Sequence, residues 1–175
     1  MVDQGYIRQA RRSEASDVPK VFSFIKELAD CQDELHVITT TEENLSKTIA
    51  FDPDECDTDA APDPITPFRP ARCLLAFNDV GEPAGMALYF YSYVTWHAAP
   101  GIYLEDLYVL PSERRAGHGE RLMKALVEEL RAVGGVRIEW RVMERNEPGL
   151  RFYEKMGAKV MEGWKDLKLE PAGTN

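Results

Sequence analysis

The six residues Arg114 to Gly119, R-R-A-G-H-G, have the composition of an anion-binding turn. They lie between an apolar run, Ile102 to Leu110, and a segment with helical apolar spacing, Glu120 to Val133. Small residues let a backbone bend tightly, and the first turn of a helix adds unpaired N–H groups and the positive end of its dipole. A phosphate could bind there without a charged side chain. The alternative is an ordinary glycine-containing turn between a strand and a helix.

The turn can be compared with known phosphate-binding sequence patterns. The turn lacks the spacing G-x-x-x-x-G-K-[ST], and it lacks G-x-G-x-x-G with an acidic residue about twenty positions later. It does match R-x-x-G-x-G, through Arg114, Gly117 and Gly119. Further positive charge at the same end comes from three side chains, those of Arg115, His118 and Arg121.

Length and charge limit the kind of protein. The chain has 175 residues, of which 44% are apolar, so it can form one well-buried core and is short for two ordinary domains. We therefore expect a single domain over residues 1–175. The net charge of −9 argues against a general nucleic-acid binder or a protein of anionic membrane surfaces, and it favours a cationic partner.

Neither a membrane segment nor a metal site is expected. Charged residues interrupt every apolar stretch before eighteen positions, and the N-terminus has no hydrophobic signal core, so we expect a cytoplasmic protein. Cys31, Cys56 and Cys73 are an odd number at wide spacings, which indicates reduced thiols. His36 and His97 have no ligand-spaced partner.

The first half of the chain predicts a strand, two helices and a hairpin. The expected ranges are Tyr6–Arg12 for the strand, a helix capped by Ser13, Ser16 or Asp17, a shorter helix from Thr40 and Glu43 to about Ala50, and hairpin strands Arg72–Phe77 and Pro83–Val94. Between them, Asp52 to Pro70 has five prolines, six acids and one arginine in nineteen residues, and therefore predicts a surface loop. Such a loop is plain solvated surface, or a lid for a cationic substrate.

The second half predicts the elements around the turn. Ile102–Leu110 is nearly all apolar, as in a strand near the centre of a sheet. The later ranges are a helix Glu120–Val133, a strand Val136–Val142, a short helix from Asn146 to Gly157, and a final hairpin in Lys159–Leu169 that turns at Glu162-Gly163. The order β-α-α-β-β-β-α-β-α-β-β predicts an α/β (α+β) fold with a mixed sheet flanked by helices.

Three stretches carry a resemblance that spans nearly the whole chain, Asp52 to Pro70 excepted. They are Y-L-E-D-L-Y-V from Tyr103, the R-R-A-G-H-G turn, and N-E-P-G-L-R-F-Y-E-K-M-G-A from Asn146. With the element order, they resemble the GNAT superfamily of N-acetyltransferases, whose sheet is mostly antiparallel. Within it the chain is most similar to the spermidine/spermine (diamine) and thialysine acetyltransferases, with support from I-K-E-L-A at Ile25, Y-S-Y with Trp96, and E-G-W-K at Glu162.

The resemblance implies where acetyl-CoA binds. Its pantetheine arm would lie along the strand Ile102–Leu110, beside Leu107, Tyr108 and Val109. Its pyrophosphate would be bound by Arg114 and by backbone N–H groups of Arg115, Gly117, His118 and Gly119. Asn146 and Tyr153 would contact the cofactor from the segment that follows the fifth strand.

The resemblance also implies two catalytic residues. An alkyl amine such as lysine has a pKa near 10.4, so only about one molecule in a thousand is unprotonated at neutral pH, and the site must remove a proton. Glu105 is the expected base, directly or through a water, unless it only pairs with an arginine. Tyr153 holds the position of the family's general acid, because a phenol is still protonated at neutral pH and can give a proton to the leaving thiolate. The alternative is a core aromatic.

The acceptor site is less well specified. Asp106 follows Glu105 and points to the opposite face in a regular strand, so it would bind a substrate ammonium across a bulge or a dimer interface, or be structural. Trp96 would form an aromatic wall for an alkyl chain or ammonium, or would pack inside.

Two departures from the polyamine-acetylating pattern favour a shorter acceptor. After the first helix this chain has Cys31 and Gln32 where those enzymes have an aromatic and an acidic residue, and Val94 replaces an aspartate. Asp33 and Glu34 lie nearby and would compensate.

The sequence therefore predicts an acetyl-CoA-dependent N-acetyltransferase that acts on the primary amine of a polyamine, a diamine or a thialysine-like amino acid. The family resemblance also implies a homodimer. Two alternatives stay open, namely a sensor that binds acyl-CoA without turnover, and an acetyltransferase of protein lysines or N-termini. The presence of both Glu105 and Tyr153 favours the enzyme.

Overall fold

The computed structural model describes residues 5–11, 17–54, 57 and 59–171. The chain divides into two compact units, Met1–Arg141 and Val142–Asn175, and each is described by itself. The single domain expected from the sequence stays a prediction. Among the described residues no helix is both long and apolar enough to cross a bilayer.

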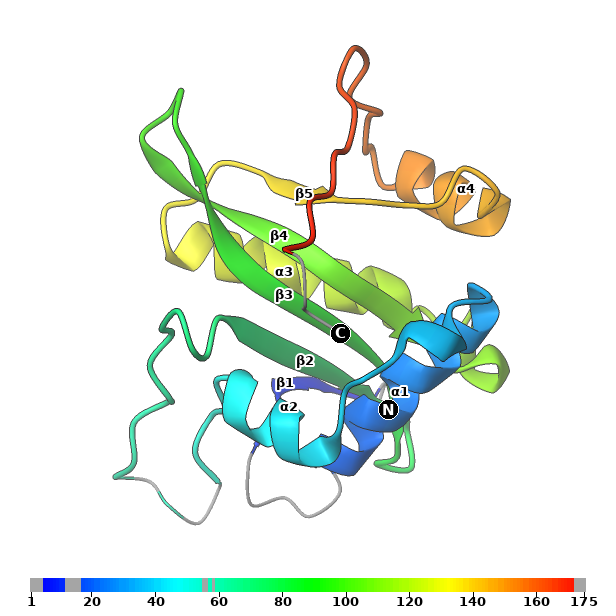
Figure 1. The fold of residues 1–175 in the computed structure, drawn as a ribbon. Coiled ribbons are helices and arrows are strands. Elements are labelled where there is room, and N and C mark those ends of the chain that lie inside the picture. The colour runs from blue at the N-terminus through cyan, green and yellow to red at the C-terminus, as the bar shows by residue number, and fades with distance from the viewer. Residues whose placement is uncertain (1–4, 12–16, 55–56, 58, 172–175) are drawn as a thin grey trace. The chain divides into compact units, whose positions relative to one another are not determined.

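The first unit is built on a five-stranded sheet with the strand order β1-β2-β3-β4-β5 (Figure 1). The strands are β1 (Ile7–Gln9), β2 (Ala71–Phe77), β3 (Pro83–Val94), β4 (Ala99–Val109) and β5 (Ile138–Trp140). All neighbours are antiparallel except β4 and β5, which are parallel. The mixed, mostly antiparallel sheet predicted from the sequence is therefore confirmed, with β1 and β5 shorter than expected and β4 starting earlier, at Ala99.

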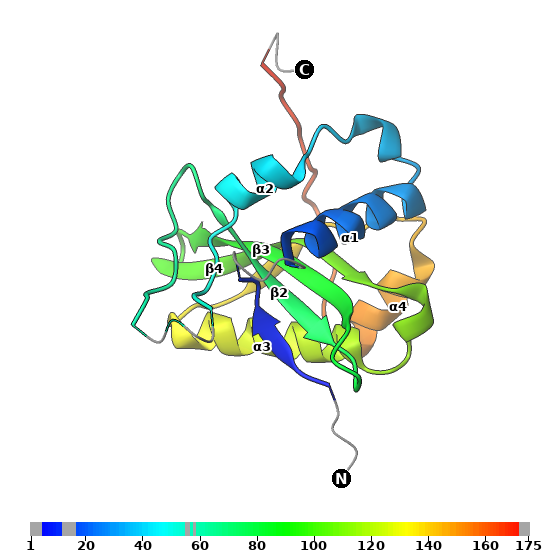
Figure 2. The ribbon, with the colours of Figure 1, turned by 90° about the horizontal axis from the view of Figure 1, so that it is seen from below.

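Helices cover both faces of this sheet, with α1 and α2 on one face and α3 on the other (Figure 2). The helical segments of the unit are α1 (Asp17–Cys31), η1 (Leu35–Val37), α2 (Glu42–Thr48), η2 (Pro111–Glu113) and α3 (His118–Ala132). The cap of α2 is Thr41 and not the predicted Thr40, since the Thr41 hydroxyl oxygen accepts from the Asn44 N–H at 3.1 Å. Ser13 and Ser16, which were expected as caps of α1, lie outside the described residues.

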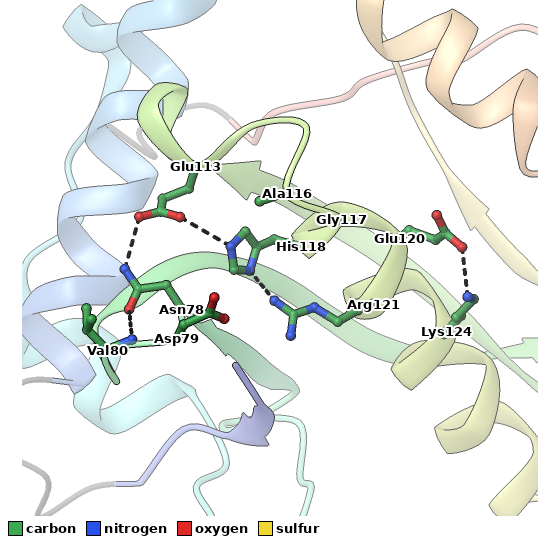
Figure 3. Close-up of a pocket in the computed structure, with 10 residues that line it drawn as sticks. All are labelled: Asn78, Asp79, Val80, Glu113, Ala116, Gly117, His118, Glu120, Arg121 and Lys124. Atoms are coloured by element: carbon green, nitrogen blue, oxygen red, sulfur yellow. Dashed lines mark hydrogen bonds and ion pairs between the residues drawn. The ribbon is translucent and has the colours of Figure 1, made fainter. Parts of the chain in front are cut away.

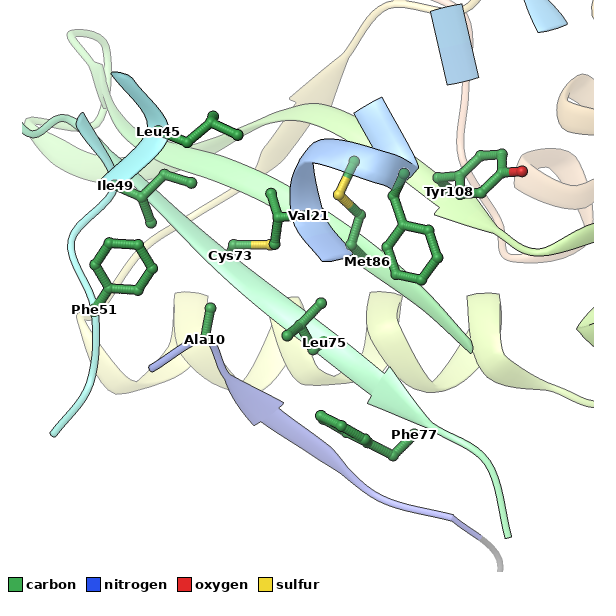
Figure 4. Packing of buried hydrophobic residues seen from close by; sticks show 11 residues of the cluster. Ala10, Val21, Leu45, Ile49, Phe51, Cys73, Leu75, Phe77, Met86 and Tyr108 are labelled. Atoms are coloured by element: carbon green, nitrogen blue, oxygen red, sulfur yellow. The ribbon is translucent and has the colours of Figure 1, made fainter. Parts of the chain in front are cut away.

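Two apolar layers fix the sheet between the helices. On one face, Val21 and Phe24 of α1 and Leu45 of α2 pack on buried residues of β2, β3 and β4 (Figure 4). On the other face, α3 contributes Leu122, Met123, Leu126 and Leu130, all buried. Burying the large side chains of these layers stabilises each by about 1.5–3 kcal/mol, so β4 is held firmly from both sides.

The cysteines differ in exposure. Cys73 is a free thiol buried in the α1–α2 layer, where burial raises its pKa far above the ordinary value. Cys31 is free and exposed at the end of α1, and Cys56 lies outside the described residues.

A buried ion pair joins the start of α1 to β1. Asp17 is fully buried, and its carboxylate lies 2.6 and 3.0 Å from the guanidinium of Arg8 and accepts from the Arg11 N–H at 2.8 Å. Asp17→Asn removes a buried carboxylate charge beside the guanidinium of Arg8, whose side chain is only 14% exposed. We expect a fall of about 3–5 kcal/mol in the free energy of unfolding, measured by urea denaturation.

The control for that variant is Glu43→Gln, which removes an exposed pair with Lys47. It should leave the denaturation midpoint almost unchanged. Equal midpoints for the two variants would contradict a structural role of Asp17.

The surface loop predicted at Asp52–Pro70 is confirmed for the residues that the structure describes, which form neither helix nor strand. Its acids are partly neutralised by arginines, with Asp52 3.0 Å from Arg72 and Asp63 2.9 Å from Arg69. The first pair ties the start of the loop to β2, whereas the second lies within the loop.

The second unit contains the helix α4 (Glu147–Lys155), as predicted. The Asn146 side chain caps it by accepting from the Gly149 N–H at 3.0 Å. The predicted final hairpin is wrong, because residues 158–171 contain the expected turn at Glu162-Gly163 and no strand. Leu167 and Leu169 are 90% and 94% exposed, so the alternating pattern covers no apolar face, and such a strand gains too little to form.

Candidate active site

The turn between η2 and α3 has the backbone of an anion site. Arg115 and Gly117 adopt left-handed conformations, with φ of 70° and 85°, and α3 begins at His118. In the described part of the chain, five consecutive backbone N–H groups donate to no protein acceptor, those of Arg115, Ala116, Gly117, His118 and Gly119. Open donors at the positive end of a helix of 15 residues are suited to a phosphate.

A cavity of about 610 Å³ opens beside this turn (Figure 3). One wall comes from the turn and α3 and the other from η2 and the β2–β3 turn. The lining residues are Ala116, Gly117, His118, Glu120, Arg121 and Lys124 on the first wall, and Asn78, Asp79, Val80 and Glu113 on the second.

The basic side chains of the turn make contacts within the protein. Arg114 donates from Nε to the carbonyl oxygen of Val109 at 3.2 Å, which ties the turn to the end of β4. His118 is buried, with 3% exposure, and its Nδ1 lies 2.7 Å from Nη2 of Arg121. The donors left open at this turn are therefore the backbone N–H groups, and the side chains of His118 and Arg121 contact each other within the protein.

One edge of β4 is open beyond the point where β5 ends. The two strands pair at Ile102↔Ile138, Tyr103↔Glu139 and Leu104↔Trp140, where β5 stops. β4 continues for five more residues, Glu105 to Val109, for which β5 offers no partner. A strand edge of this kind presents N–H and C=O groups to an extended ligand that carries amides.

A β-bulge lies at the same point of β4. Leu88 of β3 is paired with Asp106, but the next residue, Tyr89, is paired with Leu104, so Glu105 is an extra residue with no partner opposite. A bulge bends its strand and redirects side chains. It therefore decides which face of the sheet each carboxylate occupies.

The register puts both carboxylates on the face that α1 and α2 cover. Leu88 packs against the core cluster on that face, and Asp106 is directly opposite Leu88. Leu104 shares the α3 face with Tyr89, so alternation places Glu105 on the α1 face too. The opposite orientation of Asp106 expected for a regular strand is therefore not found, because the strand is not regular.

The two carboxylates differ in environment. Glu105 is exposed and Asp106 is half-buried. Burial, followed by the charge of the neighbouring Glu105, raises the pKa of Asp106 to about 6. Glu105 is thus the accessible carboxylate of the pair. A bound ammonium would stabilise the ionised form of Asp106, because its positive charge offsets both the burial and the repulsion by Glu105.

A third acid on this face was missed by the sequence reasoning. Glu27 of α1 accepts from the hydroxyl of Tyr108 at 2.8 Å and from Ser23 Oγ at 3.0 Å. Tyr108, expected beside the cofactor, is buried, with its ring 5.6 Å from that of Phe24. Glu27 belongs to the stretch I-K-E-L-A, whose spacing on an amphipathic helix was the available signal.

Trp96 is not brought to the acids within one chain. It lies in the turn between β3 and β4 and is 83% exposed, so it is neither a buried packing residue nor a wall beside Glu105. Six positions of β4 separate Ala99 from Glu105, a span of about 20 Å.

Asp33 and Glu34 follow the end of α1 that carries Glu27. Asp33 has a φ of 63°, and the Glu34 N–H donates to the Ala29 carbonyl at 2.8 Å, which holds this bend against the helix. Asp33 is exposed and Glu34 is half-buried.

Tyr153 and Asn146, the remaining expected site residues, belong to the second unit. Tyr153 lies on α4 with its ring 5.2 Å from that of Phe152, and burial raises the pKa of Tyr153 to about 12. The Asn146 side chain is engaged as the cap of α4, which leaves its amide nitrogen as the group suited to a ligand.

The Acetyltransferase (GNAT) family profile matches residues 34–158, which include the bulge, the anion-binding turn and α4. The chain belongs to the GNAT family. It is therefore an N-acetyltransferase of a family that uses acetyl-CoA, as the sequence motifs predicted.

Relatives of this GNAT acetyltransferase include enzymes named for small amines. It is 28% identical to an L-ornithine N5-acetyltransferase of Arabidopsis thaliana, over 91% of this chain and 82% of that protein. It is 29% identical to a thialysine N-epsilon-acetyltransferase of Bos taurus, over 91% of both chains. An integron cassette protein from the mobile metagenome of V. cholerae shares the fold, with a TM-score of 0.71, 19% identity and coverage of 97% and 94%.

Proposed function

We propose that this GNAT acetyltransferase transfers the acetyl group of acetyl-CoA to the primary amine of a small cationic acceptor. The acceptor class comprises polyamines, diamines and thialysine-like amino acids, and attack occurs directly in a ternary complex. The bulge at Glu105 carries the proposal, because it gives one face of the sheet two neighbouring carboxylates at the point where β4 separates from β5.

The acetyl-CoA part of the proposal is supported by the turn and by the open edge of β4. The pyrophosphate would accept from the backbone N–H groups of Arg115, Gly117, His118 and Gly119, none of which has a protein acceptor among the described residues. The amides of the pantetheine arm would pair with the β4 edge at Leu107, Tyr108 and Val109, and Arg114 steadies the end of that edge through Val109.

The acceptor part rests on charge. Glu105 would take the proton from the bound ammonium, directly or through a water, and it is the exposed member of the pair. Asp106 and Glu27 would hold the cation, or a second ammonium of a diamine. Asp33 and Glu34 would extend the acidic surface to longer acceptors. Trp96 would form an aromatic wall for the acceptor only if it came from a second copy of the chain.

Tyr153 would assist the leaving sulfur. A pKa of about 12 keeps the phenol protonated at every physiological pH. The leaving thiolate, whose conjugate acid has a pKa of about 8.5, is a weaker base than the Tyr153 phenolate and would not take the phenolic proton completely. The expected contribution of Tyr153 is therefore a hydrogen bond to the developing thiolate. Solvent would complete the proton transfer.

A thiol-release assay tests the proposal. Purified protein and acetyl-CoA are mixed with spermidine, putrescine, thialysine, ornithine, lysine, glucosamine or a lysine peptide. Turnover with a small amine and not with the peptide is the expected result. Tight acetyl-CoA binding without turnover would favour the sensor, and turnover with the peptide alone would favour a protein acetyltransferase. The homodimer and the cytoplasmic location stay predictions.

The pH dependence of kcat/KM for the amine reports on Asp106. Because its pKa is raised to about 6, Asp106 is neutral below that pH and cannot bind the ammonium, so kcat/KM should fall as the pH drops through about 6. Asp106→Asn should lower kcat/KM at pH 8 by about tenfold and remove this fall. An unaltered acid limb in the variant would exclude Asp106 from acceptor binding.

A further inference from the structure

A buried polar network lies beneath the anion-binding turn, and its centre is His118. The imidazole Nδ1 is 2.7 Å from Nη2 of Arg121, and its Nε2 is 3.3 Å from Oε2 of Glu113. The other oxygen of Glu113 accepts from Nδ2 of Asn78 at 3.0 Å, as Figure 3 shows. The network therefore links the first residue of α3 to η2 and to a residue one turn later in the same helix, and Glu113 extends it to the β2–β3 turn.

The contacts assign the state of the ring. An arginine can only donate, so Nδ1 of His118 must accept, and a carboxylate can only accept, so Nε2 must carry the hydrogen. These two contacts fit the tautomer that carries the hydrogen on Nε2. In this form the imidazole links a cation on one side to an anion on the other, and no apolar residue of the same size can do so.

The network also reaches the flanks of the cavity. Asn78 fixes the β2–β3 turn, because its Oδ1 accepts from the N–H groups of Val80 and Glu82 at 3.2 and 2.9 Å. Arg121 donates from Nη1 to the carbonyl oxygen of Gly5, ahead of β1, at 2.7 Å. The first residue of α3 is thus held from η2, from the β2–β3 turn and from the N-terminal strand.

We propose that His118 is a positioning residue for acetyl-CoA, and that its side chain acts through the turn and not on the ligand. The inference rests on the proposed function, in which the N–H groups of this turn bind the pyrophosphate. Those N–H groups must already point toward the pyrophosphate site before the ligand binds. Contacts of the His118 side chain would hold the start of α3 in that conformation without placing the imidazole against the phosphate.

The experiment compares two substitutions. His118→Gln keeps an acceptor and a donor on one neutral side chain, whereas His118→Leu fills similar space and has neither. We expect His118→Leu to raise the Kd of CoA, measured by calorimetry, about tenfold, and His118→Gln to restore most of the affinity. At saturating acetyl-CoA, kcat should change less than twofold in both, which a general loss of structure would not produce.

Glu113→Ala is the second variant, because it removes the carboxylate that contacts both His118 and Asn78. The Glu113 side chain is 26% exposed, so its loss should disturb folding less than a substitution in the core. It should weaken CoA binding severalfold. Arg131→Ala, at an exposed ion pair on the same helix, is the control and should bind CoA like the native protein.

The outcomes separate this inference from the proposed function. Native protein that does not bind CoA would refute the proposed use of the turn. Normal CoA affinity in folded His118→Leu and Glu113→Ala would overturn the positioning role and leave the proposed function intact. Equal losses in His118→Leu and His118→Gln would also overturn it, because they would make packing the cause.

Discussion

Gly117→Asp is expected to raise the Kd of acetyl-CoA by about a hundredfold or more, because a carboxylate in the anion-binding turn repels the pyrophosphate. The position demands glycine for a second reason, its left-handed φ of 85°. A Cβ there would meet no atom within 4 Å, so the fold itself has room for the new side chain. Calorimetric titration with CoA measures the loss.

Gly117→Asn separates charge from conformation. Asparagine has nearly the shape of aspartate, tolerates the left-handed region and is neutral, so this variant should lose much less affinity than Gly117→Asp. Equal losses would show that crowding, and not charge, governs the turn. Native affinity in Gly117→Asp would show that the pyrophosphate binds elsewhere.

Tyr153→Phe should lower kcat by about a hundredfold and leave the Kd of acetyl-CoA nearly unchanged. The variant removes one hydroxyl, which the proposal assigns to the leaving thiolate, and it keeps the ring that contacts Phe152. Single-turnover kinetics with a saturating amine isolate the chemical step from product release.

Tyr93→Phe is the matched control for that variant. It also removes one phenolic hydroxyl, at a residue on β3 that is 67% exposed, and it should keep the native kcat. A native turnover number in Tyr153→Phe would take the tyrosine out of the mechanism and leave solvent to protonate the thiolate.

Local patterns made most of the fold predictable. β3 has the predicted bounds, Pro83–Val94, because its apolar and aromatic run is closed by a glycine turn on one side and by the turn over residues 95–98 on the other. α4 begins and ends as expected, because Asn146 and Gly157 are strong cap signals. The final hairpin failed, because alternation alone does not provide a partner strand.

The candidate site was harder to predict where it depends on register. R-x-x-G-x-G specifies a local turn, and the turn formed. The shared face of Glu105 and Asp106 depends on how β3 and β4 pair, and no local signal reports an extra residue in one strand. The burial of His118 and the contact of Glu27 with Tyr108 likewise arise from segments far apart in the chain.

Under the proposed function, acceptor recognition depends on the number of residues in β4 as well as on their identity. Deleting one residue from β4 near position 105 would close the ladder with β3, giving a more regular sheet, and would leave that face a single acid. A homologue could keep the letters Glu-Asp at aligned positions and, without the bulge, turn its aspartate toward α3. If these two positions bind the acceptor as proposed, residue identity alone is a poor guide to which amines a relative acetylates, and the pairing register of β3 and β4 must be compared as well.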